Sequence, residues 1–130
     1  MSASTITQVQ IWTPLPPVEL SKNGRAHWAD KHAIFQDHKM IARAAVNRVL
    51  PSGFTPWRGP VDVSIVWRQH HTGHWPDRDN TITRLAAAMD GAEDAGLFAN
   101  DRQIRSYRLD YVKDIDEGVS ITFTHDEGAE

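Results

Sequence analysis

The alternation of apolar and polar positions along the chain predicts four β-strands and two helices. Strands are expected where apolar residues recur at every second position and β-branched residues are common, at residues 6–12, 61–68, 105–112 and 118–124. Helices are expected where apolar residues recur every three to four positions, at residues 28–50 and 83–95. The last two strands follow each other directly and are predicted to pair antiparallel.

The same pattern predicts which side of the first helix is buried and where the second helix ends. His38 falls on the polar side of the first helix, and its apolar side consists of Ile34, Ile41, Ala42, Ala45, Val46 and Val49. Gly96 follows the second helix and is expected to adopt the left-handed conformation that ends it. The order of elements predicts an α+β (α/β) fold, with a mixed sheet of about four strands and two main helices.

Length and composition indicate one domain over residues 1–130 and exclude several kinds of chemistry. The chain has 130 residues, of which 40% are hydrophobic and 24% charged, as is ordinary for a globular protein. It contains no cysteine, so disulfides, thiolate metal sites and cysteine nucleophiles are excluded. Because no apolar run could span a bilayer and no secretion signal is visible at the start, we expect a cytoplasmic protein.

Charge is distributed unevenly along the chain. A formal net charge of -3 by itself disfavours a nucleic-acid partner, because Lys and Arg drive binding to DNA. Residues 1–84, however, hold ten basic and six acidic residues, whereas residues 85–130 hold four basic and eleven acidic residues. An uneven solvated surface explains this pattern most simply, but the basic excess of the first part leaves a nucleic-acid partner open.

The segment from His74 to Asn80 contains the strongest candidates for metal chemistry. If Asp77 and Asp79 extend from the end of the strand at 61–68, their spacing puts both carboxylates on one face, with Cα atoms about 6.6 Å apart. Paired carboxylates repel each other and attract a cation, and their hard oxygen atoms suit Mg²⁺ or Mn²⁺. Alternatively, Asp77, Asp79 and Asn80 only cap the start of a helix, and spacing alone does not separate the two interpretations.

Two further carboxylates could join this pair. Asp101 lies in a polar loop after the second helix, and that loop could return to the first two aspartates if the helix runs antiparallel to the preceding strand. Asp90 lies within the helix and could act at the rim of the site. As a turn residue, Asp101 also has a purely structural interpretation. His70, His71 and His74 match no zinc-binding spacing, so we interpret them as structural or surface histidines.

Taken in order, these motifs resemble those of the RusA-type crossover junction endodeoxyribonucleases of bacteria and their phages. The resemblance covers most of the chain and rests on a Pro-rich turn followed by Ser21 and Asn23, Trp28 at the head of a helix, Asp77-x-Asp79-Asn80, Met89-Asp90-Gly91, Asp94-Ala95-Gly96 and Asn100-Asp101-Arg102-Gln103-Ile104. It implies a magnesium-dependent hydrolase, in which Mn²⁺ may substitute, that resolves Holliday junctions and related branched DNA in recombination and repair.

The resemblance also implies roles for individual residues. In the family, the paired aspartates and a later aspartate bind the metal that serves phosphodiester hydrolysis, and these roles carry over to Asp77, Asp79 and Asp101. The family's aspartate inside the intervening helix carries over to Asp90. Asn80 would orient the bound ion without ligating it directly.

The chain departs from the family pattern at two positions. The family usually has a lysine shortly after the Asp-x-Asp-Asn motif. Residues 81–89 contain no lysine, and Arg84 is their single cationic residue. If the helix begins near Thr83, Arg84 lies in its first turn, close to the paired aspartates, where it would neutralise charge on the phosphate. Asn100 stands where the family usually has the first aspartate of a pair. These departures bear on catalytic efficiency more than on metal binding.

A junction nuclease also needs a DNA-binding surface and two active sites. Candidate DNA contacts on the first loop and helix are Lys22, Asn23, Arg25, Lys31 and Lys39. Trp28 could stack on an unpaired base or pack internally, and its place at a helix start favours packing. Because a four-way junction is close to two-fold symmetric, paired cleavage implies a homodimer. The competing interpretations are a non-catalytic branched-DNA-binding module of the same fold and a metal-binding protein with no nucleic-acid role.

Overall fold

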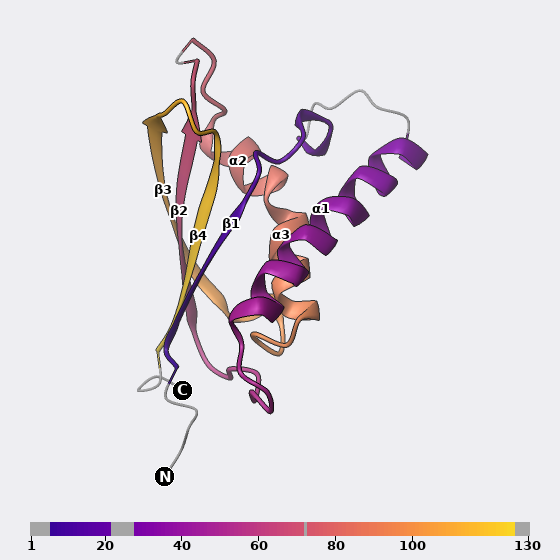
Figure 1. Cartoon of the computed structure of the whole chain (residues 1–130). Helices are drawn as coiled ribbons and strands as arrows, with labels where there is room; N and C mark the ends of the chain where they lie inside the picture. Colours follow the sequence, from indigo (N-terminus) through magenta and orange to yellow (C-terminus); the bar gives the residue numbers. More distant parts are fainter. Residues whose placement is uncertain (1–5, 22–27, 72, 127–130) are drawn as a thin grey trace.

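The computed structural model describes residues 6–21, 28–71 and 73–126, which form one mixed four-stranded sheet with α-helices over one of its faces (Figure 1). The elements are β1 (Gln8–Thr13), η1 (Val18–Leu20), α1 (Trp28–Val49), β2 (Val61–Gln69), α2 (Arg78–Arg84), α3 (Ala86–Asp94), η2 (Asp101–Gln103), β3 (Ile104–Lys113) and β4 (Gly118–His125). The predicted α+β fold with a mixed sheet of four strands is therefore confirmed. None of the helices in the described ranges has the length and apolar character needed to cross a membrane.

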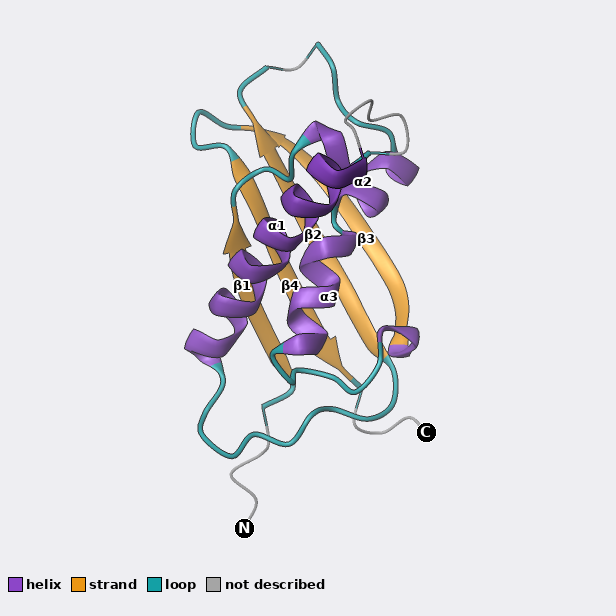
Figure 2. Ribbon diagram, turned by 90° about the vertical axis from the view of Figure 1, so that its right-hand side faces the viewer, coloured by secondary structure: helices purple, strands orange, loops and turns teal. Residues whose placement is uncertain are grey.

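The strand order differs from the one expected for the C-terminal half. The order is β1-β4-β2-β3, in which β4 runs antiparallel to both β1 and β2, while β3 runs parallel to β2 at one edge (Figure 2). The predicted antiparallel pairing of residues 105–112 with 118–124 is therefore wrong. β4 buries Phe123 on one face and Ser120 on the other, which suits a central strand, whereas β3 exposes charged residues such as Arg108, which suits an edge.

The core lies between the sheet and the helices, where apolar residues that alternate along the strands are buried. Neighbouring pairs on β2 and β4 point into this layer, among them Val63 with Phe123 and Ile65 with Ile121. All four of these side chains are at most 1% exposed. The central strands therefore form a rigid support for the polar residues of the helices and of the edge strand.

α1 and α3 cross at very short range, and small residues make this approach possible. A Cβ atom added to Gly91 of α3 would lie 2.3 Å from the carbonyl oxygen of Lys39 and 3.1 Å from the Cβ atom of Ala42, both on α1. Ala42 is fully buried at this crossing. The contact therefore requires glycine at position 91, because any side chain there would push the two helices apart.

The buried side of α1 agrees only in part with the side that hydrophobicity indicated. His38 is 2% exposed, whereas Ile41 is 41% and Val49 is 49% exposed, so the predictions for these three residues are wrong. Ala42, Ala45 and Val46 are buried as predicted. The close crossing at Gly91 accounts for the burial of Ala42, while the neighbouring Ile41 is turned toward solvent.

Burial of His38 makes stability depend on pH. Burial lowers the pKa of His38, and its Nε2 atom has no hydrogen-bond partner among the described residues. As pH falls below about 6.5, the unfolded chain takes up a proton at this position more readily than the folded chain, so folding stability should decrease. Urea unfolding at about pH 7.5 and at about pH 5.5 should show this loss, and His38→Met should reduce it, because the neutral side chain does not titrate. An equal loss in the variant would contradict the assignment.

Candidate functional site

Asp77 and Asp79 lie at the head of α2 rather than at the end of a strand. β2 ends at Gln69, and Asp77 is the N-cap of α2, with its Oδ1 atom accepting a hydrogen bond from the backbone N–H of Asn80 at 2.8 Å. Asp79 lies in the first helical turn. The predicted strand-like arrangement of the pair is therefore wrong, and the helix-cap alternative is correct for Asp77. An aspartate at this position satisfies a backbone donor that the helix itself leaves unpaired.

The second helix begins five residues earlier than the pattern indicated and is divided in two. The predicted start near Thr83 is wrong, because the cap at Asp77 starts the helix at Arg78. Leu85 separates α2 from α3, with φ of -94° and ψ of 0°, and its side chain is buried. The predicted end is confirmed, since Gly96 has a positive φ of 88° just beyond α3.

The head of α2 is fastened to the edge strand β3. Nη2 of Arg78, the residue between the paired aspartates, donates a hydrogen bond to the carbonyl oxygen of Tyr107 at 2.8 Å. The hydroxyl groups of Thr81 and Tyr111 lie 2.8 Å apart, and the ring of Trp75 lies 5.7 Å from that of Tyr111. The aspartates of α2 are therefore held beside the middle of β3, although they come from a different part of the sequence.

Asp101 lies just before the first residue of the same strand. It is the first residue of η2, and its backbone N–H donates to Oε1 of Glu93 at 2.9 Å. Asn100 and Gln103 close a capping box over this turn, which fixes the position of the loop. Burial raises the pKa of Tyr107, and the negative charge of Asp101 raises it further, so the Asp101 carboxylate lies within electrostatic range of the Tyr107 hydroxyl.

Two of these carboxylates are available for a ligand. Asp79 and Asp101 are exposed, and neither carboxylate accepts a hydrogen bond or forms an ion pair within the described ranges. The Asp77 carboxylate, in contrast, is engaged with Asn80. Sequence patterns did not indicate a role for Tyr107, because its place on an alternating strand marked it only as a core residue.

The described residues contain no group of three acidic or histidine side chains that could hold a metal ion. Asp77, Asp79 and Asp101 thus border one stretch of β3 without forming a complete ligand set. Mg²⁺ commonly takes only one or two protein carboxylates and completes its shell with water and substrate phosphate. The donor chemistry of Asp79 and Asp101 fits such an ion, which would then depend on the substrate for its remaining ligands.

Asp90 and Lys39 form part of the contact between the helices instead of the candidate site. The Nζ atom of Lys39 lies 3.5 Å from a carboxylate oxygen of Asp90 and 3.8 Å from one of Asp94. The Lys39 side chain is only 20% exposed. The rim position of Asp90 and the phosphate contact of Lys39 stay predictions, because the described contacts only pair Lys39 with Asp90 and Asp94. Glu93, which sequence patterns did not single out, lies next to Asp101.

Arg84 lies in the last turn of α2, far along the helix from its capped end. Its Nη2 atom donates to the carbonyl oxygen of Pro16, and its guanidinium lies 4.9 Å from the centre of the Trp67 ring. Burial lowers the pKa of Arg84, and the nearby Glu19 opposes this shift. The premise that Arg84 occupies the first turn is wrong, and the contacts of its side chain are with the core and with the segment after β1.

These contacts predict that Arg84 acts on stability more than on catalysis. Arg84→Met keeps the apolar stem and removes the guanidinium, which should lower the free energy of unfolding by about 1–2 kcal/mol through loss of the cation–π contact and the hydrogen bond. Cleavage measured well below the melting temperature should change by less than about 3-fold. A loss of about 10-fold or more in a fully folded variant would instead place Arg84 in the catalytic machinery, as the family lysine suggests.

Among the predicted DNA-binding residues, Trp28 and Lys31 lie near the start of α1. Lys22, Asn23 and Arg25 lie outside the described residues. Trp28 is 74% exposed, so the preference for internal packing is wrong. The reason is its position at the first residue of α1, beyond the part of the helix that packs on α3 and β1. Lys31 is also near this end, and its Nζ atom donates to the carbonyl oxygen of Ser21 at 3.2 Å.

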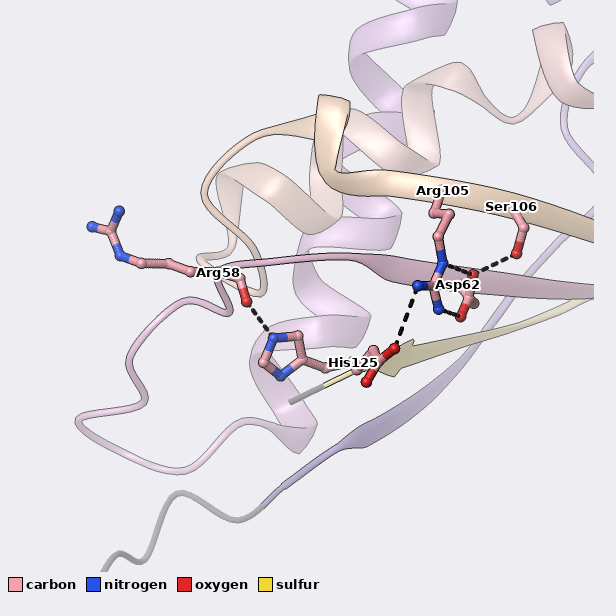
Figure 3. Close-up of polar contacts among 6 residues, drawn as sticks. Arg58, Asp62, Arg105, Ser106 and His125 are labelled. Atoms are coloured by element: carbon pink, nitrogen blue, oxygen red, sulfur yellow. Dashed lines mark hydrogen bonds and ion pairs between the residues drawn. The ribbon is translucent and has the colours of Figure 1, made fainter. Parts of the chain in front are cut away.

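A second polar cluster lies where β2 and β3 begin (Figure 3). Asp62 accepts hydrogen bonds from Nη2 of Arg105 at 2.7 Å and from the hydroxyl of Ser106 at 2.6 Å, and these bonds lower its pKa. Arg105 also reaches Asp126 at 3.3 Å. Because these contacts already engage the Asp62 carboxylate, we interpret the cluster as a fastening of the edge strand rather than as a ligand site.

Comparisons with known proteins do not indicate a function for this chain. No protein-family model matches the sequence, and no curated protein matches it either.

Proposed function

We propose that this chain is a metal-dependent endonuclease that resolves Holliday junctions and related branched DNA by phosphodiester hydrolysis. The observation that carries the proposal is the pair of exposed carboxylates of Asp79 and Asp101, which have no partner among the described residues and lie on two turns that adjoin β3. Isolated acidic residues are common on protein surfaces, but here two turns are each fixed by a cap and both border the same edge strand. The order of motifs shared with the RusA-type family supports the same function.

The residues at this site have distinct roles in the proposed reaction. Asp79 and Asp101 would hold Mg²⁺ together with the substrate phosphate, and Asp77 maintains the position of Asp79 by starting the helix. When bound, the ion supplies positive charge that polarises the phosphate and lowers the pKa of a coordinated water. Asn80 holds the Asp77 carboxylate through its backbone amide, and Arg78 keeps the helix head against β3. No side chain needs to bond covalently to phosphorus.

The proposed function includes a homodimer acting on a four-way junction. Two cuts placed symmetrically about the centre of the junction require two active sites, and one chain carries one such site. Binding to phosphates should weaken as salt concentration rises, because each contact by Lys or Arg releases condensed counterions. Strong salt dependence would distinguish this function from that of a metal-binding protein without a nucleic-acid partner.

One observation favours a second candidate, a branched-DNA-binding module of the same fold without turnover. Within the described ranges no three carboxylates converge, so the ligand set is incomplete before substrate binds. The two candidates differ in their response to divalent cations. A nuclease cuts a labelled four-way junction in Mg²⁺ and stops when EDTA is added, whereas the binding module shifts the junction in a gel and leaves its strands intact under both conditions. Absence of cleavage in both Mg²⁺ and Mn²⁺ would overturn the proposed nuclease function.

A further inference from the structure

The outer face of α1 carries an ordered stripe of exposed residues. Asp37, Ile41, Ala44 and Arg48 follow one another at spacings of four, three and four residues, so they line one side of the helix. All four are exposed, and Met40 beside them is 50% exposed. The stripe is thus apolar at its centre, acidic at one end and basic at the other.

This stripe faces away from the rest of the described chain. α1 packs through Ala42, Ala45 and Val46 against α3 and β1, and these residues are at most 5% exposed. Figure 1 shows α1 as the outermost helix of its layer, with α3 and the sheet on its inner side. The exposed stripe therefore has room for a second helix.

A second copy of the stripe complements these charges only when its α1 runs antiparallel to the first. Asp37 and Arg48 are eleven residues apart, about 16 Å along the helix axis, so they cannot pair with each other. Neither forms an ion pair with another described residue. A second α1 running antiparallel, with a two-fold axis between Ile41 and Ala44, places Asp37 opposite Arg48 of the partner subunit and Arg48 opposite Asp37 of the partner subunit. A parallel second helix would instead bring like charges together.

We propose that α1 pairs antiparallel with α1 of a second copy of this chain, through Ile41 and Ala44 at the centre and Asp37 with Arg48 at both ends. The small side chain of Ala44 lets the helices approach, and Ile41 from each subunit packs against Ala44 of the other. Two helices alone bury less than the roughly 1,200–2,000 Å² of a typical stable interface, so the dissociation constant should be on the order of micromolar.

The pairing identifies an interface for the dimer that the proposed nuclease function requires. The evidence for it comes only from residues of α1. The stripe contains none of the carboxylates of the candidate site. Its test therefore measures association of the protein without DNA or metal. If the variants show that α1 is not the dimer interface, the proposed nuclease function can still be correct, and if cleavage fails, the pairing is unaffected.

The decisive experiment uses charge reversal in sedimentation velocity at about 50 μM, above the expected dissociation constant. The parental protein should sediment as a dimer. Asp37→Arg and Arg48→Asp should each be folded monomers, because each variant places like charges together at both ends of the helix pair. When these two variants are mixed, they should form a heterodimer, since every charge then faces its opposite. The double variant should be a dimer again.

Several results would overturn the pairing. These are a monomeric parental protein, single variants that dimerise as well as the parental protein, or a mixture of the two variants that stays monomeric. Ile41→Glu supplies an independent check, because it inserts a charge at the centre of the stripe and should weaken association by at least about 10-fold. Circular dichroism confirms that each variant is folded, which is expected because the substituted side chains are exposed.

Discussion

Asp79→Asn is expected to reduce junction cleavage by at least about 100-fold while leaving junction binding intact or stronger. The Asp79 carboxylate is exposed and unpartnered in the described chain, so the substitution removes a metal ligand without breaking a contact of the fold. Loss of one negative charge also eases approach of the phosphate backbone. Cleavage is measured with a labelled four-way junction in Mg²⁺, and binding is measured by gel shift in Ca²⁺.

Asp90→Asn is the matched control for this substitution. Both residues are aspartates of the same helical region, but the Asp90 carboxylate faces Lys39 across the helix contact. Cleavage by this variant should stay within about 3-fold of the parental rate, and the surface ion pair should contribute at most about 1 kcal/mol to stability. If Asp79→Asn retained parental cleavage, or if Asp90→Asn lost as much activity, the assignment of the metal ligands would be wrong.

Gly91→Ala should destabilise the protein by about 1–3 kcal/mol, although the same change in an open helix stabilises by about 0.5–1 kcal/mol. The added Cβ atom would meet the backbone oxygen of Lys39 at 2.3 Å, and backbone cannot move aside as a flexible side chain can. α1 and α3 must then separate, which loosens the packing around Ala42. The free energy of unfolding from urea titration measures the effect.

Gly73→Ala tests whether the effect belongs to the helix crossing. No heavy atom beyond its chain neighbours lies within 4 Å of a Cβ atom added to Gly73, so this variant should change stability by less than about 0.5 kcal/mol. A Gly91→Ala variant as stable as the parental protein, or more stable, would show that the crossing of α1 and α3 is looser than described.

The sequence predicted those parts of the fold that depend on local periodicity. Val63 and Phe123 lie in strands whose alternation showed directly which side is buried. Gly96 ends its helix as predicted, because its positive φ is a property of one residue. Strand order is different in kind, since it depends on which strand can be buried on both faces. β4 lies between β1 and β2 because it can be buried on both faces, and the order of the strands in the sequence did not indicate this position.

The candidate site shows the same division between local and tertiary information. Residue types and spacing singled out Asp77, Asp79 and Asp101, but the first of these serves as a helix cap. The spacing rule for strands did not apply, because the chain reaches the aspartates through a loop rather than directly from β2. The contacts of Arg84 and the approach of Asp101 to Tyr107 depend on tertiary packing, so no local pattern could have predicted them.

The most direct test of the central claim is to locate a bound ion. A crystal structure of the protein with a four-way junction and Mn²⁺, in which anomalous scattering identifies the metal, should show the ion beside β3. Carboxylate oxygens of Asp79 and Asp101 should ligate it at about 2.1 Å together with a phosphate oxygen of the junction. A metal bound elsewhere on the chain, or a junction bound with these two carboxylates facing solvent, would contradict the account.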